Sequence, residues 1–279
     1  MQNTRFELEI LGSRGGCPHP DNPCAGYLLH ADQTSILFEC GPGIAGRVWP
    51  RLRVGGVHAV VISHMHGDHF MDLVPLTYGF LGEHAVPGRP LGARPELWLP
   101  PGGRQTLRSV ALAFGFAHIF DGPGHAHHSG VPLIDRYFAI HEYTDASTFT
   151  IGSVRLRSAG VPHTIDSYAL RAEHDEHSLV YSGDTSGGPA LIELAQECDL
   201  LLCEASSVDE GPALPPGHLT SAQTGQIAQA AGCARLVMTH VIEYDATEEA
   251  LVGGAARAFQ GPASVARPGQ RYDIAGRLK

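Results

Sequence analysis

A run of metal-competent side chains near residue 65 constrains this chain more than any other feature. The apolar segment Ala59-Val60-Val61-Ile62 predicts a buried strand, and it leads directly into Ser63-His64-Met65-His66-Gly67-Asp68-His69. Apolar residues at helical spacing from Phe70 to Leu81 then predict a helix. Side chains on a strand-to-helix turn can diverge around two adjacent ions, and a single ion would not need so many. Imidazole with carboxylate suits zinc and related metals, so the sequence predicts a metal centre here.

The composition is that of a folded, globular protein. The chain has 279 residues, of which 43% are hydrophobic and 17% are charged, and it is long enough to bury a large core. Its net charge of -10 argues against a broad nucleic-acid surface, which needs clustered Lys and Arg. The six cysteines lack the density and spacing of a disulfide scaffold. No segment resembles a signal peptide or a membrane span, so we expect a cytoplasmic protein without a membrane partner.

Strand and helix signals continue through both halves of the sequence without a polar linker. This predicts one domain over residues 1–279, of the α+β class, with two mixed β-sheets between outer helices. The histidine- and glycine-rich segment from Phe116 to Ser129 predicts a loop or lid, and Thr220 with Gln223 predicts a capping box at a helix start. A second, antiparallel sheet is predicted from strand signals at Arg136–His141, Phe149–Ile151, Val154–Ala159, Ser167–Ala172 and Ser178–Ser182.

Three further polar residues follow predicted strands. They are His163 in Val-Pro-His-Thr, Asp184 in Tyr-Ser-Gly-Asp-Thr and His240 in Val-Met-Thr-His. Loops at strand ends are where rigid scaffolds place functional groups. Each residue alone has a structural explanation, such as a capping Asp or a hydrogen-bonded His. Together with the first cluster they form a set of seven candidate ligands.

The pattern His-x-His-x-Asp-His, followed by distant His, Asp and His residues, resembles the metallo-β-lactamase superfamily over nearly the whole chain. The resemblance implies an αββα sandwich and two divalent metal ions, with Zn²⁺ expected and Mn²⁺ or Fe²⁺ as alternatives. The Zn-dependent β-lactamases commonly carry a cysteine at the position of Asp184, which counts against lactam hydrolysis. The implied ligands are His64, His66 and His163 for one metal, Asp68, His69 and His240 for the other, and Asp184 as the bridge.

Within the superfamily the chain looks most like the ribonuclease Z and phosphodiesterase branch. Phe38–Gly43 is similar to that branch's F-D-C-G-E-G, with Glu in place of Asp. Cys203–Ser206 resembles its H-E-A-T motif, and Gly217–Ala222 resembles its H-S-T motif before a helix. These motifs imply that Glu204 holds His218, which protonates the leaving oxygen as a general acid.

Two departures from that branch bear on the substrate. The loop Pro18–Pro23 lacks the branch's basic residues and its R-N pair, and His163 and Asp184 are only about twenty residues apart. Bacterial ribonuclease Z carries a long tRNA-gripping arm between the corresponding positions. We therefore expect a small phosphodiester substrate, such as a cyclic nucleotide, attacked by a metal-bridging hydroxide that Asp68 orients. A large nucleic-acid substrate is disfavoured, and a homodimer is an option for the assembly.

Other functions remain open at this point. One is a ribonuclease Z-like tRNA 3′ endonuclease, and another is a thioester, lactone or sulfate ester hydrolase on the same fold. The Glu204 and His218 pair argues against a thioester substrate, because a thiolate leaving group scarcely requires protonation. An iron oxygenase with the same ligands and a non-catalytic binding module are the remaining alternatives.

Overall fold

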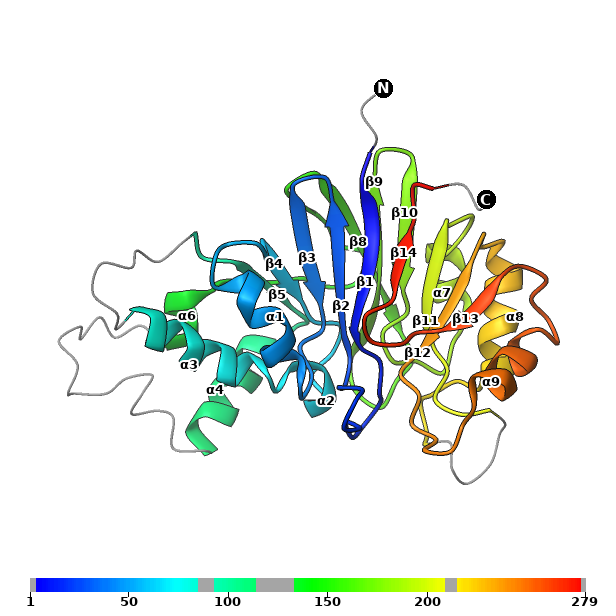
Figure 1. The fold of residues 1–279 in the computed structure, drawn as a ribbon, viewed down its shortest axis with the longest axis horizontal. Helices are drawn as coiled ribbons and strands as arrows, with labels where there is room; N and C mark the ends of the chain where they lie inside the picture. The colour runs from blue at the N-terminus through cyan, green and yellow to red at the C-terminus, as the bar shows by residue number, and fades with distance from the viewer. Residues whose placement is uncertain (1–3, 85–92, 114–132, 209–214, 277–279) are drawn as a thin grey trace.

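Two β-sheets form the centre of the molecule, and helices cover the outer face of each sheet (Figure 1). The computed structural model describes residues 4–84, 93–113, 133–208 and 215–276. The layers are helix, sheet, sheet and helix, so the expected α+β class and αββα sandwich are confirmed. The predicted loop or lid from Phe116 to Ser129 lies outside the described residues. Within the described ranges, no helix is both long and apolar enough to cross a membrane.

The first sheet contains strands from both ends of the chain. Antiparallel pairing joins its first four strands, and parallel pairing joins the rest. The strands lie in the order β14 (Arg271–Asp273), β1 (Phe6–Gly12), β2 (Gly26–Ala31), β3 (Thr34–Phe38), β4 (Ala59–Val61), β5 (Glu96–Leu99) and β6 (Ala139–Glu142). Every residue of β2 and β4 is buried, as expected of inner strands that are covered on both faces.

The second sheet is mixed, which agrees with the predicted fold of two mixed sheets, and the strands predicted to pair antiparallel do so, with the exception of Arg136–His141. The strands lie in the order β13 (Ala263–Val265), β12 (Leu236–Thr239), β11 (Leu200–Glu204), β10 (His177–Tyr181), β9 (Ser167–His174), β8 (Val154–Val161) and β7 (Thr148–Ile151). Strands β7 to β10 pair antiparallel, whereas β10 to β13 pair parallel because helices connect them. The short edge strands β13 and β14 were not predicted.

The predicted strand Arg136–His141 is wrong at its beginning. Residues Leu133–Tyr137 form a short helix, α6, and the strand that follows is β6, which pairs with β5 in the first sheet. Ile134, Tyr137 and Phe138 have the spacing of one helix face, and all three are buried. Tyr137 stacks on Phe80 at a centroid distance of 5.6 Å, so burial of this face decides the local structure.

Helices and sheets enclose three layers of apolar side chains. One layer fills the space between the sheets, where the rings of Tyr27 and Tyr181 lie 5.2 Å apart. The other two layers lie between each sheet and its helices. The helices on the first sheet are α1 (Ile44–Leu52), α3 (Leu73–His84), α4 (Gly103–Ala113) and α6, with α2 (Gly67–Phe70) at the end of β4. Those on the second sheet are α7 (Pro189–Leu194), α8 (Ser221–Ala231) and α9 (Glu248–Ala255).

The loops that carry the candidate ligands gather at one end of the sandwich. Strands β4, β8, β10 and β12 end there, beside α2 and away from both chain termini (Figure 1). Helix α8 begins at this end too, and Thr220 with Gln223 forms the predicted capping box. The two sheets therefore place side chains from distant parts of the sequence around one space.

Glu9 on β1 links three basic side chains away from this end. Its carboxylate accepts hydrogen bonds from Arg51 at 2.8 Å and Arg271 at 2.9 Å, and it lies 3.5 Å from Nε2 of His30. The interaction with His30 and the two guanidinium groups outweighs burial and lowers the pKa of Glu9 from 4.5 to about 2. Because the folded pKa is the lower one, this stabilisation is present above about pH 4.5 and is lost as the pH falls toward 2.

We expect Glu9→Gln to lower the free energy of unfolding by about 1–3 kcal/mol at neutral pH. It should also weaken the dependence of stability on pH below about 4.5, because the ionised form is removed. Urea unfolding at a series of pH values measures both effects. Glu7→Gln, on the same strand with a more exposed side chain, is the control and should change stability by less than about 1 kcal/mol. Equal effects of the two variants would contradict the prediction.

Candidate metal centre

The histidine-rich run forms a tight turn between β4 and α2. The strand ends at Val61, and His64 lies fully buried below the turn. His66 is the residue before α2, whereas Asp68 and His69 lie within the helix. The change from strand to helix therefore spreads the side chains over two adjacent positions, as the sequence predicted.

One group of candidate ligands combines this turn with the second sheet. Nδ1 of His66 lies 3.1 Å from Nε2 of His64 and 3.1 Å from Nε2 of His163. Oδ2 of Asp184 lies 3.5 Å from His64 Nε2 and 4.0 Å from His163 Nε2. His163 follows β8, and Asp184 follows β10. These four residues converge on one point.

A second group lies directly beside the first. Nε2 of His240 is 3.1 Å from both Nε2 of His69 and Oδ2 of Asp68. Oδ2 of Asp184 is 3.3 Å from His69 Nε2 and 3.2 Å from His240 Nε2. The Asp184 carboxylate thus belongs to both groups. The structure brings all seven predicted ligands together in the arrangement that the resemblance implied.

The donor atoms fit divalent metal ions. Ligands about 2.0–2.1 Å from a tetrahedral zinc lie roughly 3.3 Å from one another, close to the separations seen here. Oδ1 of Asp184 is buried and has no hydrogen-bond partner among the described residues, although an ionised oxygen of this kind requires one. His64, His66, His163 and Asp184 would hold one ion, and Asp68, His69 and His240 would hold the other with the same Asp184.

Burial and charge set the protonation of the first group. Burial lowers the pKa of His64 well below its usual range, and the neighbouring histidines lower it further. Burial likewise lowers the pKa of His66 and His163. These three imidazoles are therefore neutral near pH 7, which is the form that binds metal.

Two carboxylates, Asp184 and Asp68, determine the protonation of the second group. Burial opposes ionisation of Asp184 and Asp68, but the neighbouring histidines outweigh it, so the pKa of each carboxyl lies well below its usual range. Burial also lowers the pKa of His69 and His240, yet Asp184 outweighs it and raises both. The buried carboxylates thus draw positive charge to this point. A divalent ion bound here would supply that charge in place of the histidine protons.

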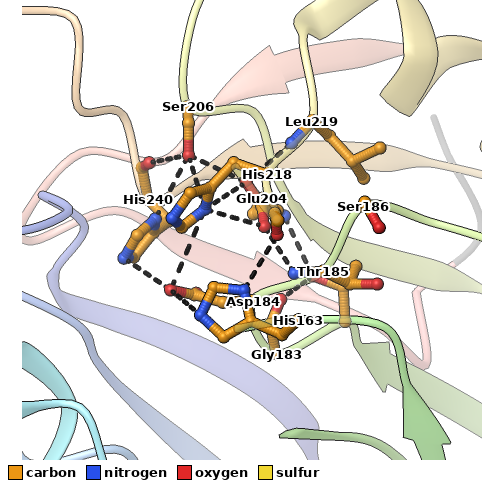
Figure 2. Close-up of polar contacts among 12 residues, drawn as sticks. His163, Gly183, Asp184, Thr185, Ser186, Glu204, Ser206, His218, Leu219 and His240 are labelled. Atoms are coloured by element: carbon orange, nitrogen blue, oxygen red, sulfur yellow. Dashed lines mark hydrogen bonds and ion pairs between the residues drawn. The ribbon is translucent and has the colours of Figure 1, made fainter. Parts of the chain in front are cut away.

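A carboxylate and imidazole pair lies against the ligands (Figure 2). Nδ1 of His218 donates to Glu204, 3.1 Å from each carboxylate oxygen, and lies 4.0 Å from Oδ2 of Asp184. Glu204 is fully buried and also accepts from the backbone N–H groups of Thr185 and Leu219, at 2.6 and 3.1 Å. These bonds fix the carboxylate, which in turn fixes the predicted His218.

Supporting residues around the centre were not predicted as site residues. Ser206 Oγ contacts the Glu204 carboxylate at 2.8 Å and Nδ1 of His218 at 3.2 Å. Glu39 is fully buried, accepts from the Ser63 N–H at 2.9 Å, and lies 3.6 Å from Nδ1 of His69. Both residues lie in motifs that the sequence showed, but only the folded structure reveals what they contact.

Two backbone groups also hold the ligands in place. The Gly16 N–H donates to Oδ2 of Asp68 at 2.7 Å, and Nδ1 of His163 donates to the Gly217 carbonyl at 2.9 Å. Outer hydrogen bonds of this kind fix the tautomer and orientation of metal ligands. No side-chain pattern signals them, because any residue type carries these backbone groups.

Comparisons with known proteins agree with this geometry. The family described as "Beta-lactamase superfamily domain" matches residues 34–241, a range that includes every candidate ligand and the Glu204 and His218 pair. Uncharacterized protein ML1173 of Mycobacterium leprae is 31% identical over 270 residues, covering 96% of this chain and 88% of that protein. Ribonuclease Z of Mycobacterium marinum is 29% identical over 250 residues, covering 85% and 86% of the two chains. The solved structure of YhfI from Bacillus subtilis has a TM-score of 0.78 at 21% identity, covering 96% and 99%.

We expect the purified protein to contain close to two divalent ions per chain, one for each ligand group. His66→Ala should lower the metal content and the activity together. The loss of metal affinity and of activity should exceed the roughly 10–100-fold that is typical when a supporting outer partner is removed. Elemental analysis after mild dialysis tests this directly. His58→Ala, at an exposed histidine outside both groups, is the control and should keep its metal. A wild-type protein with one ion or none would overturn the two-metal assignment.

Proposed function

Because the chain belongs to the β-lactamase superfamily and carries a divalent-metal centre, we propose that it is a phosphodiesterase acting on a small phosphodiester, such as a cyclic nucleotide. We propose zinc as the metal, since five imidazoles and two carboxylates are ligands that zinc prefers. When bound, two such ions lower the pKa of a water and neutralise charge on phosphoryl oxygens. The remaining chemistry falls to the side chains of the chain itself.

The Glu204 and His218 pair is the observation that carries this proposal. Glu204 occupies Nδ1 of His218, which leaves Nε2 as the ring nitrogen that can exchange a proton with a substrate. The imidazole is only 9% exposed, so it cannot move far from the metal ligands. A phosphodiester with an alkoxide leaving group needs a proton at that oxygen, whereas a thioester does not. The pair therefore favours phosphodiester cleavage over thioester cleavage.

Asp68 has a second role in the proposed reaction, besides metal binding. Its Oδ2 atom is held by the Gly16 N–H and by His240, so the carboxylate has a fixed position on the side of the second ligand group. A fixed carboxylate can orient the attacking hydroxide by accepting a hydrogen bond from it. We assign Asp68 this role in addition to metal binding.

The surroundings of His163 support a small substrate. The segment between His163 and Asp184 forms the β9 and β10 hairpin of the second sheet, which leaves no room for an inserted arm. An open cavity of about 410 Å³ adjoins His163, and Asp145 and Asp166 line it. Carboxylates on this wall repel the successive phosphates of a nucleic-acid strand.

Endonucleolytic cleavage of tRNA precursors is the second candidate function. The ribonuclease Z of Mycobacterium marinum, at 29% identity over 250 residues, is the observation that favours it. The two candidates share the metal centre and the general acid, and they differ in how much of the substrate the protein contacts.

We expect His218→Ala to slow the hydrolysis of diesters with poor alkoxide leaving groups by about 10²–10⁴-fold. Activated p-nitrophenyl diesters should lose much less, because a nitrophenolate leaves with little protonation. Metal content should stay unchanged, since the seven ligands remain. Steady-state kinetics on both substrate types, with Ser186→Ala as a nearby exposed control, measures the difference. Equal losses on both types would show that His218 does not act as a general acid.

We also expect a higher kcat/KM for small diesters than for precursor tRNA at the same salt concentration. The panel should include cyclic nucleotides and sugar phosphodiesters. The physical reason is the scarcity of phosphate contacts on an acidic chain, since each lost contact weakens nucleic-acid binding and flattens its salt dependence. Efficient, strongly salt-dependent release of the tRNA 3′ trailer, with little turnover of small diesters, would establish the second candidate instead.

A further inference from the structure

The glycine- and proline-rich loop of residues 13–24 contacts the candidate metal centre. Besides the bond from Gly16 to Asp68, the Gly15 N–H donates to the Val241 carbonyl at 3.2 Å. A Cβ atom on Gly15 would lie 2.6 Å from the His240 ring, so only glycine permits this close approach. The loop therefore runs along the ligands of the second group.

The outer part of this loop is held in a closed turn. The His19 N–H donates to the Asn22 carbonyl at 2.9 Å, and the Asn22 N–H donates back to His19 at 3.1 Å. Oδ1 of Asn22 accepts from the Ser13 N–H at 2.9 Å. These bonds and the neighbouring prolines fix the backbone, so the exposed His19 has a defined position.

Tyr244 lies across from His19, four residues after the candidate ligand His240. Its side chain is 72% exposed, and its ring centroid lies 5.6 Å from that of His19. The Arg14 guanidinium lies 5.8 Å from the Tyr244 ring and donates to the carbonyl oxygens of Ile242 and Glu243. We call Arg14, His19 and Tyr244 the aromatic rim.

The aromatic rim has the features of a site for a flat, unsaturated ring. Among the described residues, the exposed large hydrophobic side chains are Val54, Ile165 and Tyr244, and Tyr244 is the aromatic member. The backbone bonds around it are already made, so a ligand that stacks there need not order the loop. An aromatic face next to a guanidinium binds nucleobases by stacking and cation–π contacts, whatever the base.

We propose that the aromatic rim binds the base of the substrate while the metal centre binds its phosphodiester. The substrate class is then a phosphodiester that carries a nucleobase, in preference to a sugar or glycerol diester. This inference rests on the proposed phosphodiesterase function. It gives a role to the loop in which the sequence departs from the ribonuclease Z pattern.

Equilibrium binding measures the contribution of the aromatic rim to affinity without requiring catalysis. Calorimetry on the metal-loaded full chain compares adenosine 5′-monophosphate with ribose 5-phosphate, which lacks the base. The wild type should bind the nucleotide more tightly. Tyr244→Ala should weaken nucleotide binding about tenfold and leave ribose 5-phosphate unaffected, within the range for loss of one stacking side chain. Tyr244→Phe keeps the ring and should bind as the wild type does, and Ile165→Ala is the exposed apolar control.

A kinetic experiment tests the same inference by comparing kcat/KM for a cyclic nucleotide with kcat/KM for a glycerol phosphodiester. Tyr244→Ala should lower kcat/KM about tenfold for the first and leave the second unchanged. Equal affinity of the wild type for the two phosphates, or equal losses on both substrates, would overturn the inference. If no diester is hydrolysed but nucleotide binding still depends on Tyr244, the proposed function fails and the rim stands. If diesters are hydrolysed without dependence on Tyr244, the function stands and the rim fails.

Discussion

The buried Asp184 carboxylate is the point on which the arrangement of this molecule depends. One oxygen of Asp184 lies within 4.0 Å of four candidate ligand nitrogens, two from each group. An anion that is almost fully buried is costly unless cations or hydrogen-bond donors surround it. The histidines that meet this need come from a turn after β4 and from loops after β8 and β12. The electrostatic requirement of one side chain therefore fixes the relative positions of loops from both sheets.

A second buried carboxylate, next to the candidate ligands, has the same electrostatic requirement. Glu204 is also a buried carboxylate, and backbone N–H groups, Ser206 and His218 together satisfy it. Because Ser206 Oγ also lies 3.4 Å from Nδ1 of His240, His218 and the candidate ligands share one hydrogen-bond network. A change of any one member leaves another buried polar group without its partner, which generally costs about 1–3 kcal/mol. Positioning of Glu204 and His218 and local stability therefore arise from the same contacts.

The sequence identified the seven residues that the structure brings together because their signals are local. His64, His66, Asp68 and His69 lie within six residues, and His163, Asp184 and His240 each follow a strong strand signal. The supporting residues Glu39 and Ser206 could not be predicted, because their partners are set by tertiary distances. The predicted strand Arg136–His141 began two residues inside the helix Leu133–Tyr137, since a short apolar segment fits either structure until its packing is known.

The way the ligands are divided between the sheets has a mechanical consequence. His64, His66, Asp68 and His69 extend from the first sheet, whereas His163, Asp184 and His240 extend from the second, and each group takes members from both. An ion in either position would thus be a cross-link between two halves of the sandwich, in addition to the apolar contacts and hydrogen bonds, such as that between Tyr27 and Thr239, that already join them. Metal uptake would tie the ends of the two sheets together and stabilise the folded chain by mass action. Removal of the ions would loosen the contact between the sheets at the end where the candidate ligands gather.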